Sequence, residues 1–331
     1  SGVILRLDDD VWVNTPVESY NPNFVGASTP FELDLDLGAG MLCVHGDGLE
    51  SAAEFWLMPA FHGTTNDAGE PYNSYAFTHA DRVRIAPIEG CAMTCKFCNL
   101  PYDFRYRTKR VEGLVDSVRQ ALADPIQPAA HVLVSGGTPR QADIGYVRDV
   151  YRSVLEGFDV PVDIMMVPVD DLIDPQWLDG LGVNELSINL EMFSAELSRT
   201  VMPQKFRQGR EHYLSFIDRA GEVLGEGRVR SMLMVGLEPP EDTVAGVRAI
   251  VDRGGVPVLS PFRPDPGTPL EKMAPPTAET LATVYLEALE LCTAHDRALG
   301  PSCIPCSHNT LTFARRETGP AMRYYGQVAL V

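Results

Sequence analysis

Three cysteines within eight residues constrain this chain more than any other feature of its sequence. Cys91, Cys95 and Cys98 stand in a CxxxCxxC spacing, directly after a short segment rich in valine and isoleucine. Three thiolates on one loop can hold three irons of an iron–sulfur cube and leave the fourth iron open to a small molecule. A zinc site or a set of buried thiols are the alternatives, but zinc usually takes four ligands and this loop supplies three. The spacing therefore favours a cluster whose open iron is available for chemistry.

The composition indicates a globular protein of a reducing compartment. Seven cysteines are an odd number for a disulfide framework, and three of them share one loop. The excess of 45 acidic over 27 basic residues gives a formal net charge of −18, which would repel nucleic acids and anionic membranes. No apolar run approaches the roughly 20 residues of a membrane span, and the start of the chain has no signal-peptide pattern. We expect a cytoplasmic protein without a nucleic-acid or membrane partner.

From about residue 81 the sequence alternates between short apolar segments and segments with helical periodicity. Strands are predicted at 82–88, 131–134, 163–167, 185–190, 231–235 and 256–260. Each strand is followed by a predicted helix, at 111–122, 144–155, 175–181, 207–223, 244–251 and 278–299. Such alternation predicts an α/β fold with a parallel sheet and helices outside it.

Residues 1–80 lack this alternation. Turn signals separate short apolar runs there, and segment 31–37 alternates between apolar and acidic residues, as a strand with one wet face does. We therefore expect three parts. These are an N-terminal extension of strands and loops at 1–80, a barrel domain at 81–272, and a C-terminal helix with a cysteine-containing tail at 273–331.

The cysteine loop resembles the signature of the radical S-adenosylmethionine (SAM) superfamily. Besides the CxxxCxxC spacing it has an aromatic residue, Phe97, just before the last cysteine, and it follows a predicted strand. The resemblance implies a partial (βα)6 TIM-like barrel, with function at the C-terminal ends of its strands. It also implies a [4Fe–4S] cluster on Cys91, Cys95 and Cys98, with SAM chelating the open iron through its amino and carboxylate groups. Phe97 would pack beside the cluster or the adenine.

The second predicted strand ends in a pair of glycines. Gly136 and Gly137 would let a ligand approach the backbone closely, although a plain turn also uses such residues. The segment resembles the GGE motif of the superfamily, whose backbone contacts the amino group of SAM. Thr138 stands here in place of the usual acid.

The fourth predicted strand carries polar side chains at alternate positions. Ser187, Asn189 and Glu191 share one face at the period of a strand, and polar groups that point into a barrel need partners. The resemblance implies that Asn189 and Glu191 bond the ribose or the methionine part of SAM. A purely structural network is the alternative.

Later segments extend the resemblance to about residue 272. Arg210 resembles the arginine that pairs with the SAM carboxylate in the hydrogenase-maturase group, with Arg199 and Arg207 as competitors for that role. Segment 236–243 is similar to a GxxET..D stretch of the superfamily, and the Gly-Thr-Pro-Leu at 267–270 is similar to the same place in biotin synthase.

Two further cysteines lie in the tail. Cys303 and Cys306 form a CxxC that could ligate a second iron–sulfur cluster, hold zinc or act as a redox pair. With Cys43 and Cys292 they make four, the number that a second cube requires. The latter two stand in apolar company, where a free cysteine is usually a small buried hydrophobe. Cys303 and Cys306 are therefore the candidate ligands of an auxiliary metal site.

The resemblance implies radical SAM catalysis. The reduced cluster would cleave SAM to a 5′-deoxyadenosyl radical, which removes a hydrogen from a small-molecule substrate and leads to sulfur insertion or a carbon-skeleton change. A one-electron donor such as flavodoxin or ferredoxin would reduce the cluster. The alternative is a non-catalytic iron–sulfur or zinc-binding protein, such as a redox sensor or a scaffold that retains the fold.

Overall fold

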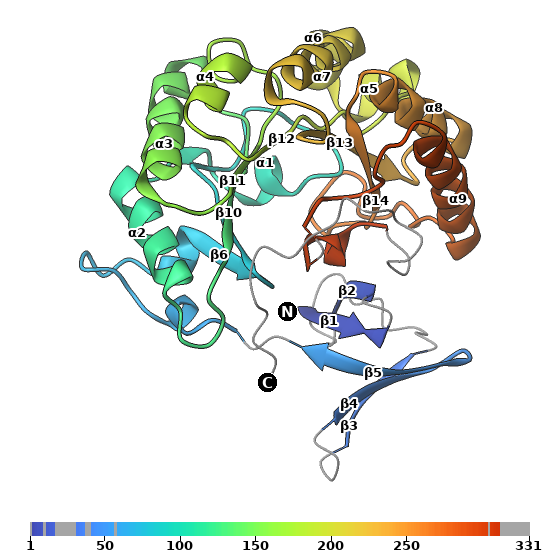
Figure 1. Cartoon of the computed structure of the whole chain (residues 1–331), viewed down its shortest axis with the longest axis horizontal. Helices are drawn as coiled ribbons and strands as arrows, with labels where there is room; N and C mark the ends of the chain where they lie inside the picture. The colour runs from blue at the N-terminus through green and yellow to red at the C-terminus, as the bar shows by residue number, and fades with distance from the viewer. Residues whose placement is uncertain are drawn as a thin grey trace.

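A seven-stranded, curled sheet organises the chain (Figure 1). The computed structural model describes residues 2–8, 11–16, 31–36, 41–55, 58–303 and 305–311. The order of the strands is β14-β13-β12-β11-β10-β7-β6, and all neighbours are parallel except β6 and β7. The strands are β6 (Ala76–His79), β7 (Arg82–Ile85), β10 (His131–Val134), β11 (Val162–Met165), β12 (Glu185–Ser187), β13 (Val229–Val235) and β14 (Val256–Pro261). The predicted partial TIM-like barrel is confirmed.

Helices cover the convex side of this sheet (Figure 1). They are α2 (Val111–Leu122), α3 (Ile144–Gly157), α4 (Pro175–Gly180), α5 (Ala195–Val201), α6 (Pro203–Gln208), α7 (Arg210–Leu224), α8 (Pro240–Val251) and α9 (Ala278–Ala294). The six predicted helices correspond to α2, α3, α4, α7, α8 and α9. Two short helices, α5 and α6, were not predicted. The helix predicted at 207–223 begins only at Arg210, because Gly209, with φ 89°, separates α6 from α7.

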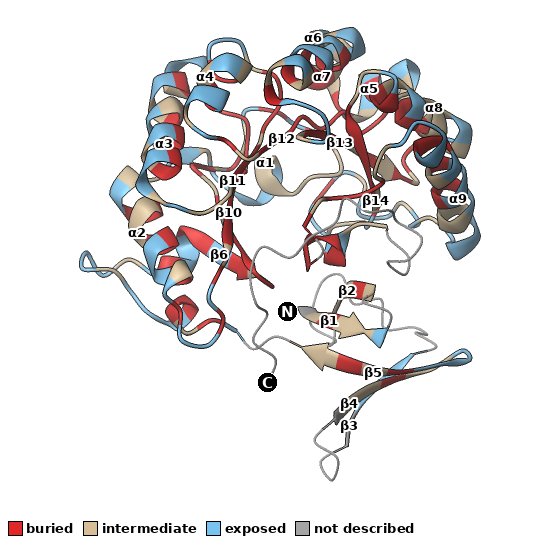
Figure 2. Ribbon diagram, in the orientation of Figure 1, coloured by how far each residue is buried: buried red, intermediate tan, exposed pale blue. Residues whose placement is uncertain are grey.

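The two faces of the sheet differ in chemistry. Side chains that face the helices, such as Val83, Val132 and Ile164, are apolar and fully buried in the main core, and Figure 2 shows the matching buried sides of the helices. The alternate positions, which face inward, are polar or charged at the N-terminal ends of the strands. They include Arg82 beside His131 and Asp163 beside Glu185 in the strand register. The barrel interior therefore contains buried charge.

That charge is paired around one arginine. Arg230 on β13 bonds both Glu185 and, at 3.1 Å from Nη2 to Oδ2, Asp163, and all three side chains are at least nine-tenths buried. The second oxygen of Asp163 accepts a hydrogen bond of 2.7 Å from Asn184, and Ser302 donates to Glu185. Buried charges are tolerated when they are paired and hydrogen-bonded. This cluster fixes the mutual positions of β11, β12 and β13.

The N-terminal residues form a second, antiparallel sheet with the order β2-β1-β5-β4-β3. Its small core contains Leu5, Val44 and Ala53. The strands are β1 (Gly2–Leu7), β2 (Val11–Pro16), β3 (Glu32–Asp36), β4 (Met41–Gly46) and β5 (Leu49–Phe55). β3 lies within the strand predicted at 31–37, whereas β6, which also precedes residue 81, belongs to the barrel sheet. In the described part of the chain, no helix has the length and apolar character needed to cross a bilayer.

Replacing Arg230 by methionine tests the buried ion cluster. Arg230→Met leaves Asp163 and Glu185 buried without their cation, so we expect the free energy of unfolding to fall by about 3–5 kcal/mol. Urea denaturation followed by circular dichroism measures this change. Arg219→Met, at an exposed position of α7, is the control and should leave the unfolding midpoint unchanged. An unchanged midpoint in Arg230→Met would contradict the role assigned to the cluster.

Candidate cluster and cofactor site

The cysteine loop is held against the C-terminal edge of the sheet. It follows β7 and the short strand β8 (Ile88–Glu89) and ends at helix α1 (Leu100–Asp103). The amide of Ala92 donates to the carbonyl of Thr138 at 3.0 Å, and the amide of Lys96 donates to the carbonyl of Val201 at 2.9 Å. The loop is therefore fixed on one side by the segment after β10 and on the other by the end of α5.

The three thiols of the loop differ in their surroundings. Cys91 Sγ accepts hydrogen bonds from the amides of Met93 at 3.3 Å and Thr138 at 3.2 Å. Burial raises the pKa of Cys95 to about 12, while Lys205 acts in the opposite direction. Burial also raises the pKa of Cys98. Because a bound metal supplies positive charge, it would overcome this cost of ionising buried thiols.

The distances between the three thiols bear on whether the loop suits a cluster or a single metal ion. Two groups of residues in the described ranges have metal-ligating atoms that all lie within 4.8 Å of one another, and the loop cysteines form neither group. A zinc site would bring its ligands this close together. The loop therefore suits a cluster, which spreads its cysteines over several irons, better than the zinc alternative.

The paired glycines make room for the cysteine loop itself. A Cβ atom on Gly137 would lie 1.7 Å from the carbonyl oxygen of Gly90, and Gly136 has φ 139°. The group that approaches Gly137 is thus the backbone of the loop, and the predicted approach of a ligand stays a prediction. Gly136 and Thr138 also line the cavity beside the thiols, so their contact with the amino group of SAM stays a prediction.

The polar residues predicted to face the cofactor lie at the end of β12 and just after it, and their hydrogen bonding differs. Asn189 Oδ1 accepts hydrogen bonds from Ser187 Oγ at 2.8 Å and from the amide of Met232 at 3.2 Å, as the structural-network alternative expects. Glu191 differs, because its backbone has φ 70° and its Oε2 is buried without a hydrogen-bond partner. Strained backbone and an unsatisfied polar atom are features of functional sites.

Lys205 is the residue of this site that the sequence did not indicate. It projects from α6, and its buried ammonium group donates to the carbonyl of Asn189 at 2.9 Å and to Glu191 Oε1 at 3.2 Å. The only available signal was its rarity, since the chain has four lysines. Folding places this cation in the same cavity as Cys91, Cys95, Cys98, Phe97, Asn189 and Glu191.

Arg210 lies in a neighbouring cavity. Its guanidinium group donates to the carbonyl of Phe193 at 2.9 Å and stacks on that ring at 4.1 Å. The cysteine cavity measures about 130 Å³ and the neighbouring one about 280 Å³, and Lys205 lines both. The pairing of Arg210 with the SAM carboxylate stays a prediction, and Lys205 is a second candidate for it.

The segment at 236–243 stabilises the stretch of chain that follows Glu191. The carboxylate of Glu238 accepts hydrogen bonds from the amides of Phe193 at 2.9 Å and Ser194 at 2.7 Å, and from Thr243 at 3.3 Å. Glu238 therefore fixes the path of the chain from Glu191 into α5. The turn at Gly267, with φ 79°, faces Asp103 of α1, since a Cβ there would lie 3.0 Å from Oδ1.

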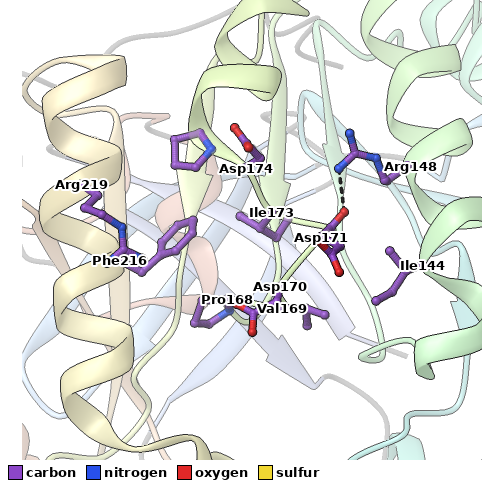
Figure 3. A pocket seen from close by; sticks show the side chains of 11 residues that line it. Ile144, Arg148, Pro168, Val169, Asp170, Asp171, Ile173, Asp174, Phe216 and Arg219 are labelled. Carbon is purple, nitrogen blue, oxygen red and sulfur yellow. Dashed lines mark hydrogen bonds between the residues drawn. The ribbon is translucent and has the colours of Figure 1, made fainter.

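A larger cavity, of about 600 Å³, lies away from the cysteines, among α3, α4 and α7 (Figure 3). Arg148 donates to the carbonyl of Asp171 at 2.6 Å across its wall and lies over the ring of Trp177. Its lining contains no cysteine and no buried charged side chain. Size alone therefore does not identify the site.

The two tail cysteines do not join this cavity. Cys303 and Cys306 lie near Asp81 and His131, at the N-terminal ends of β7 and β10. Cys43 lies on β4 and Cys292 on α9, and neither belongs to this group. The described residues thus do not assemble the four cysteines that a second cube would require.

Comparisons with known proteins agree with this geometry. Residues 85–249, about half of the chain, match the profile of the Radical SAM superfamily. The chain is 26% identical over 128 residues to the bacteriochlorophyllide c C-7(1)-hydroxylase of Chlorobaculum limnaeum, in a match that covers 38% of this chain and 32% of the hydroxylase. The chain therefore spans about a third of the length of that relative.

Two solved structures share the fold. A radical SAM methyltransferase from Sphaerobacter thermophilus superposes with a TM-score of 0.53 at 14% identity, over 86% of this chain and 81% of that chain. The FeFe-hydrogenase maturase HydG from Carboxydothermus hydrogenoformans gives a TM-score of 0.51 at 13% identity, over 73% and 62% of the two chains. At these identities the likeness concerns the fold alone.

Removing one loop thiol tests the cluster. After anaerobic reconstitution we expect about four irons per chain in the unaltered protein and a loss of most of them in Cys95→Ala, because two thiolates do not hold a cube. Iron and sulfide analysis measures this loss. Cys43→Ala, on the separate N-terminal sheet, should retain the full amount. Full retention by Cys95→Ala would show that the loop is not the ligand.

Proposed function

Because this chain belongs to the radical SAM superfamily, we propose that it is an enzyme that binds a [4Fe–4S] cluster through Cys91, Cys95 and Cys98 and SAM next to it. The observation that carries this proposal is the Lys205–Glu191 pair in the cysteine cavity. One carboxylate oxygen of Glu191, Oε2, is buried without a partner beside the thiols. Such an atom is costly unless a ligand satisfies it.

The residues of the cavity fit SAM in charge. SAM carries an amino group, a carboxylate and ribose hydroxyls. Glu191 Oε2 can accept from a hydroxyl or an ammonium group, and the Lys205 ammonium can pair with a carboxylate. When bound, the cluster and SAM supply an electron and a carbon-centred radical that removes a hydrogen atom from the substrate. The polar pair of this chain would bind and orient the cofactor for that step.

Apolar side chains of the same cavity would protect the reaction. Met93, Met165, Met166, Val167 and Phe97 line it together with Leu100 and Pro101. These side chains exclude water and offer no acidic protons next to the reacting centre, which limits side reactions. Phe97 packs against the main core, so its position beside the cluster is rigid.

We propose a small-molecule substrate for the reaction. Of the two predicted outcomes, sulfur insertion loses its candidate sulfur source, because Cys303 and Cys306 lie at the other end of the barrel. The other predicted outcome, a carbon-skeleton change, is therefore favoured. The hydroxylase relative supports a reaction that begins with removal of hydrogen from a carbon atom. A one-electron donor such as flavodoxin or ferredoxin would reduce the cluster.

The strained backbone of Glu191 argues against a non-catalytic scaffold. A scaffold needs the cysteines and the fold, but not a glutamate with φ 70° and an unsatisfied oxygen. Such strain is retained where the geometry serves a ligand. The catalytic proposal accounts for this residue, and the scaffold alternative leaves it unexplained.

Cleavage of SAM by the reduced protein tests the proposal. The anaerobically reduced enzyme is expected to convert SAM to 5′-deoxyadenosine, measured by chromatography. Lys205→Met should weaken SAM binding about 10- to 100-fold, because hydrogen bonds to charged groups contribute about 1.5–3 kcal/mol. Equilibrium dialysis measures that binding without turnover.

Lys272→Met provides the matched control, since Lys272 is exposed and outside the cavity. It should bind and cleave SAM like the unaltered protein. Absence of 5′-deoxyadenosine from protein with a full complement of cluster iron would refute the catalytic proposal. Unchanged SAM affinity in Lys205→Met would refute the role of Lys205 alone.

A further inference from the structure

A second set of metal-ligating side chains lies at the N-terminal end of the barrel. Asp81 precedes β7, His131 begins β10, and Cys303 and Cys306 come from the tail. Their exposed fractions are 4%, 0%, 0% and 5%, and one ligand atom from each lies within 4.8 Å of all the others. Residues more than 220 positions apart in the sequence thus converge on one buried point.

The distances between these atoms suit one tetrahedral ion. Cys303 Sγ lies 3.6 Å from Asp81 Oδ1, and Cys306 Sγ lies 3.5 Å from His131 Nε2. With zinc–ligand bonds of about 2.0–2.3 Å, a tetrahedron separates its ligand atoms by about 3.3–3.8 Å. Both of these separations therefore already match the edge length of such a tetrahedron.

Two further details distinguish this group from a plain hydrogen-bonded cluster. Asp81 Oδ2 is buried without a hydrogen-bond partner, which is costly in a site that contains no ligand. The amide of Cys306 donates to Cys303 Sγ at 3.3 Å, as the amide of Met93 donates to Cys91 Sγ in the cluster loop. Both details are explained by a cation at the centre of the group.

We propose that Asp81, His131, Cys303 and Cys306 bind one zinc ion. Two thiolates and a carboxylate bring three negative charges against the two positive charges of zinc, and the buried Arg82 and Arg230 act electrostatically on Cys306. Four protein ligands leave no open position, so the site is structural. It is independent of the proposed SAM chemistry, which takes place at the opposite end of the strands.

The group does not suit a second iron–sulfur cluster. It offers two thiolates, whereas a cube usually takes four cysteines distributed over its irons. The remaining cysteines, Cys43 and Cys292, are on β4 and α9. Two thiolates with an imidazole and a carboxylate, in tetrahedral spacing, are instead a mononuclear set that zinc accepts.

The proposed ion would close the open side of the partial barrel. β14 forms one edge of the sheet, and β6, which pairs with β7, forms the other. The tail runs beside β14. The amide of Gly300 donates to the carbonyl of Pro257 at 2.9 Å, and the amide of Leu311 donates to the carbonyl of Leu259 at 2.7 Å. Figure 1 shows this segment, in red, turning from β14 toward β6.

On the far side of the gap the tail reaches the other edge of the sheet. The ring of His308 stacks on His79 of β6 at 5.8 Å, and the cysteines reach Asp81 and His131. An ion held by tail and strands would thus join the two edges. The zinc ion would thereby link the tail, which is bonded to β14, to the strands on the opposite side of the gap.

Metal analysis of the full chain tests the site. Protein purified anaerobically from zinc-containing medium, without reconstitution, should contain about one zinc per chain. The double variant Cys303→Ser/Cys306→Ser should lose that zinc and keep its cluster iron after reconstitution. Cys43→Ser should keep both metals. Zinc should also raise the unfolding temperature of the unaltered protein, because it binds only the folded state.

Asp81→Asn keeps the proposal testable if the double variant does not fold. This variant preserves the shape of the side chain and removes its charge, so we expect at least about 10-fold weaker zinc retention against a chelator. Absence of zinc from the unaltered protein would overturn the proposal. An unchanged zinc content in both variants would overturn it as well. So would a double variant that loses iron and sulfide and keeps its zinc.

Discussion

Buried charge inside the curled sheet is the constraint on which the rest of the structure depends. The outward positions of the strands are apolar and pack against helices, whereas the inward positions carry arginine, histidine and carboxylates. Such groups cannot remain unpaired in a low-dielectric interior. Arg230 compensates Asp163 and Glu185 in the middle of the sheet. At the two ends, where protein partners are incomplete, Glu191 and Asp81 each retain a buried oxygen without a partner.

These two ends have different donor sets and therefore suit different metals. At the C-terminal end, three thiols on one loop do not form a group within 4.8 Å of one another, and they line a cavity together with Lys205 and Glu191. At the N-terminal end, four donors from three distant segments meet within 4.8 Å. The first arrangement leaves a ligand position open for chemistry, and the second closes it. By our two proposals, one sheet thus carries a reactive centre and a structural one.

The sequence was sufficient for what depends on local pattern. Apolar runs and helical periodicity predicted six strand–helix pairs, and the CxxxCxxC spacing indicated the loop proposed to hold the cluster. It was insufficient where the decisive partner comes from far along the chain. Nothing near Lys205 indicates that its ammonium group meets Glu191, and nothing near Cys303 indicates Asp81, 222 residues away. The pairing of Gly137 with Gly90 was likewise hidden, although the need for a glycine was visible.

Anomalous X-ray diffraction from crystals of the reconstituted chain, recorded at the iron and zinc absorption edges, tests the central claim that the two ends of the barrel hold different metals. The account predicts an iron signal beside Cys91, Cys95 and Cys98. It also predicts a separate zinc signal between Cys303, Cys306, Asp81 and His131. Iron at the tail cysteines, zinc at the loop, or no metal at either place would contradict it.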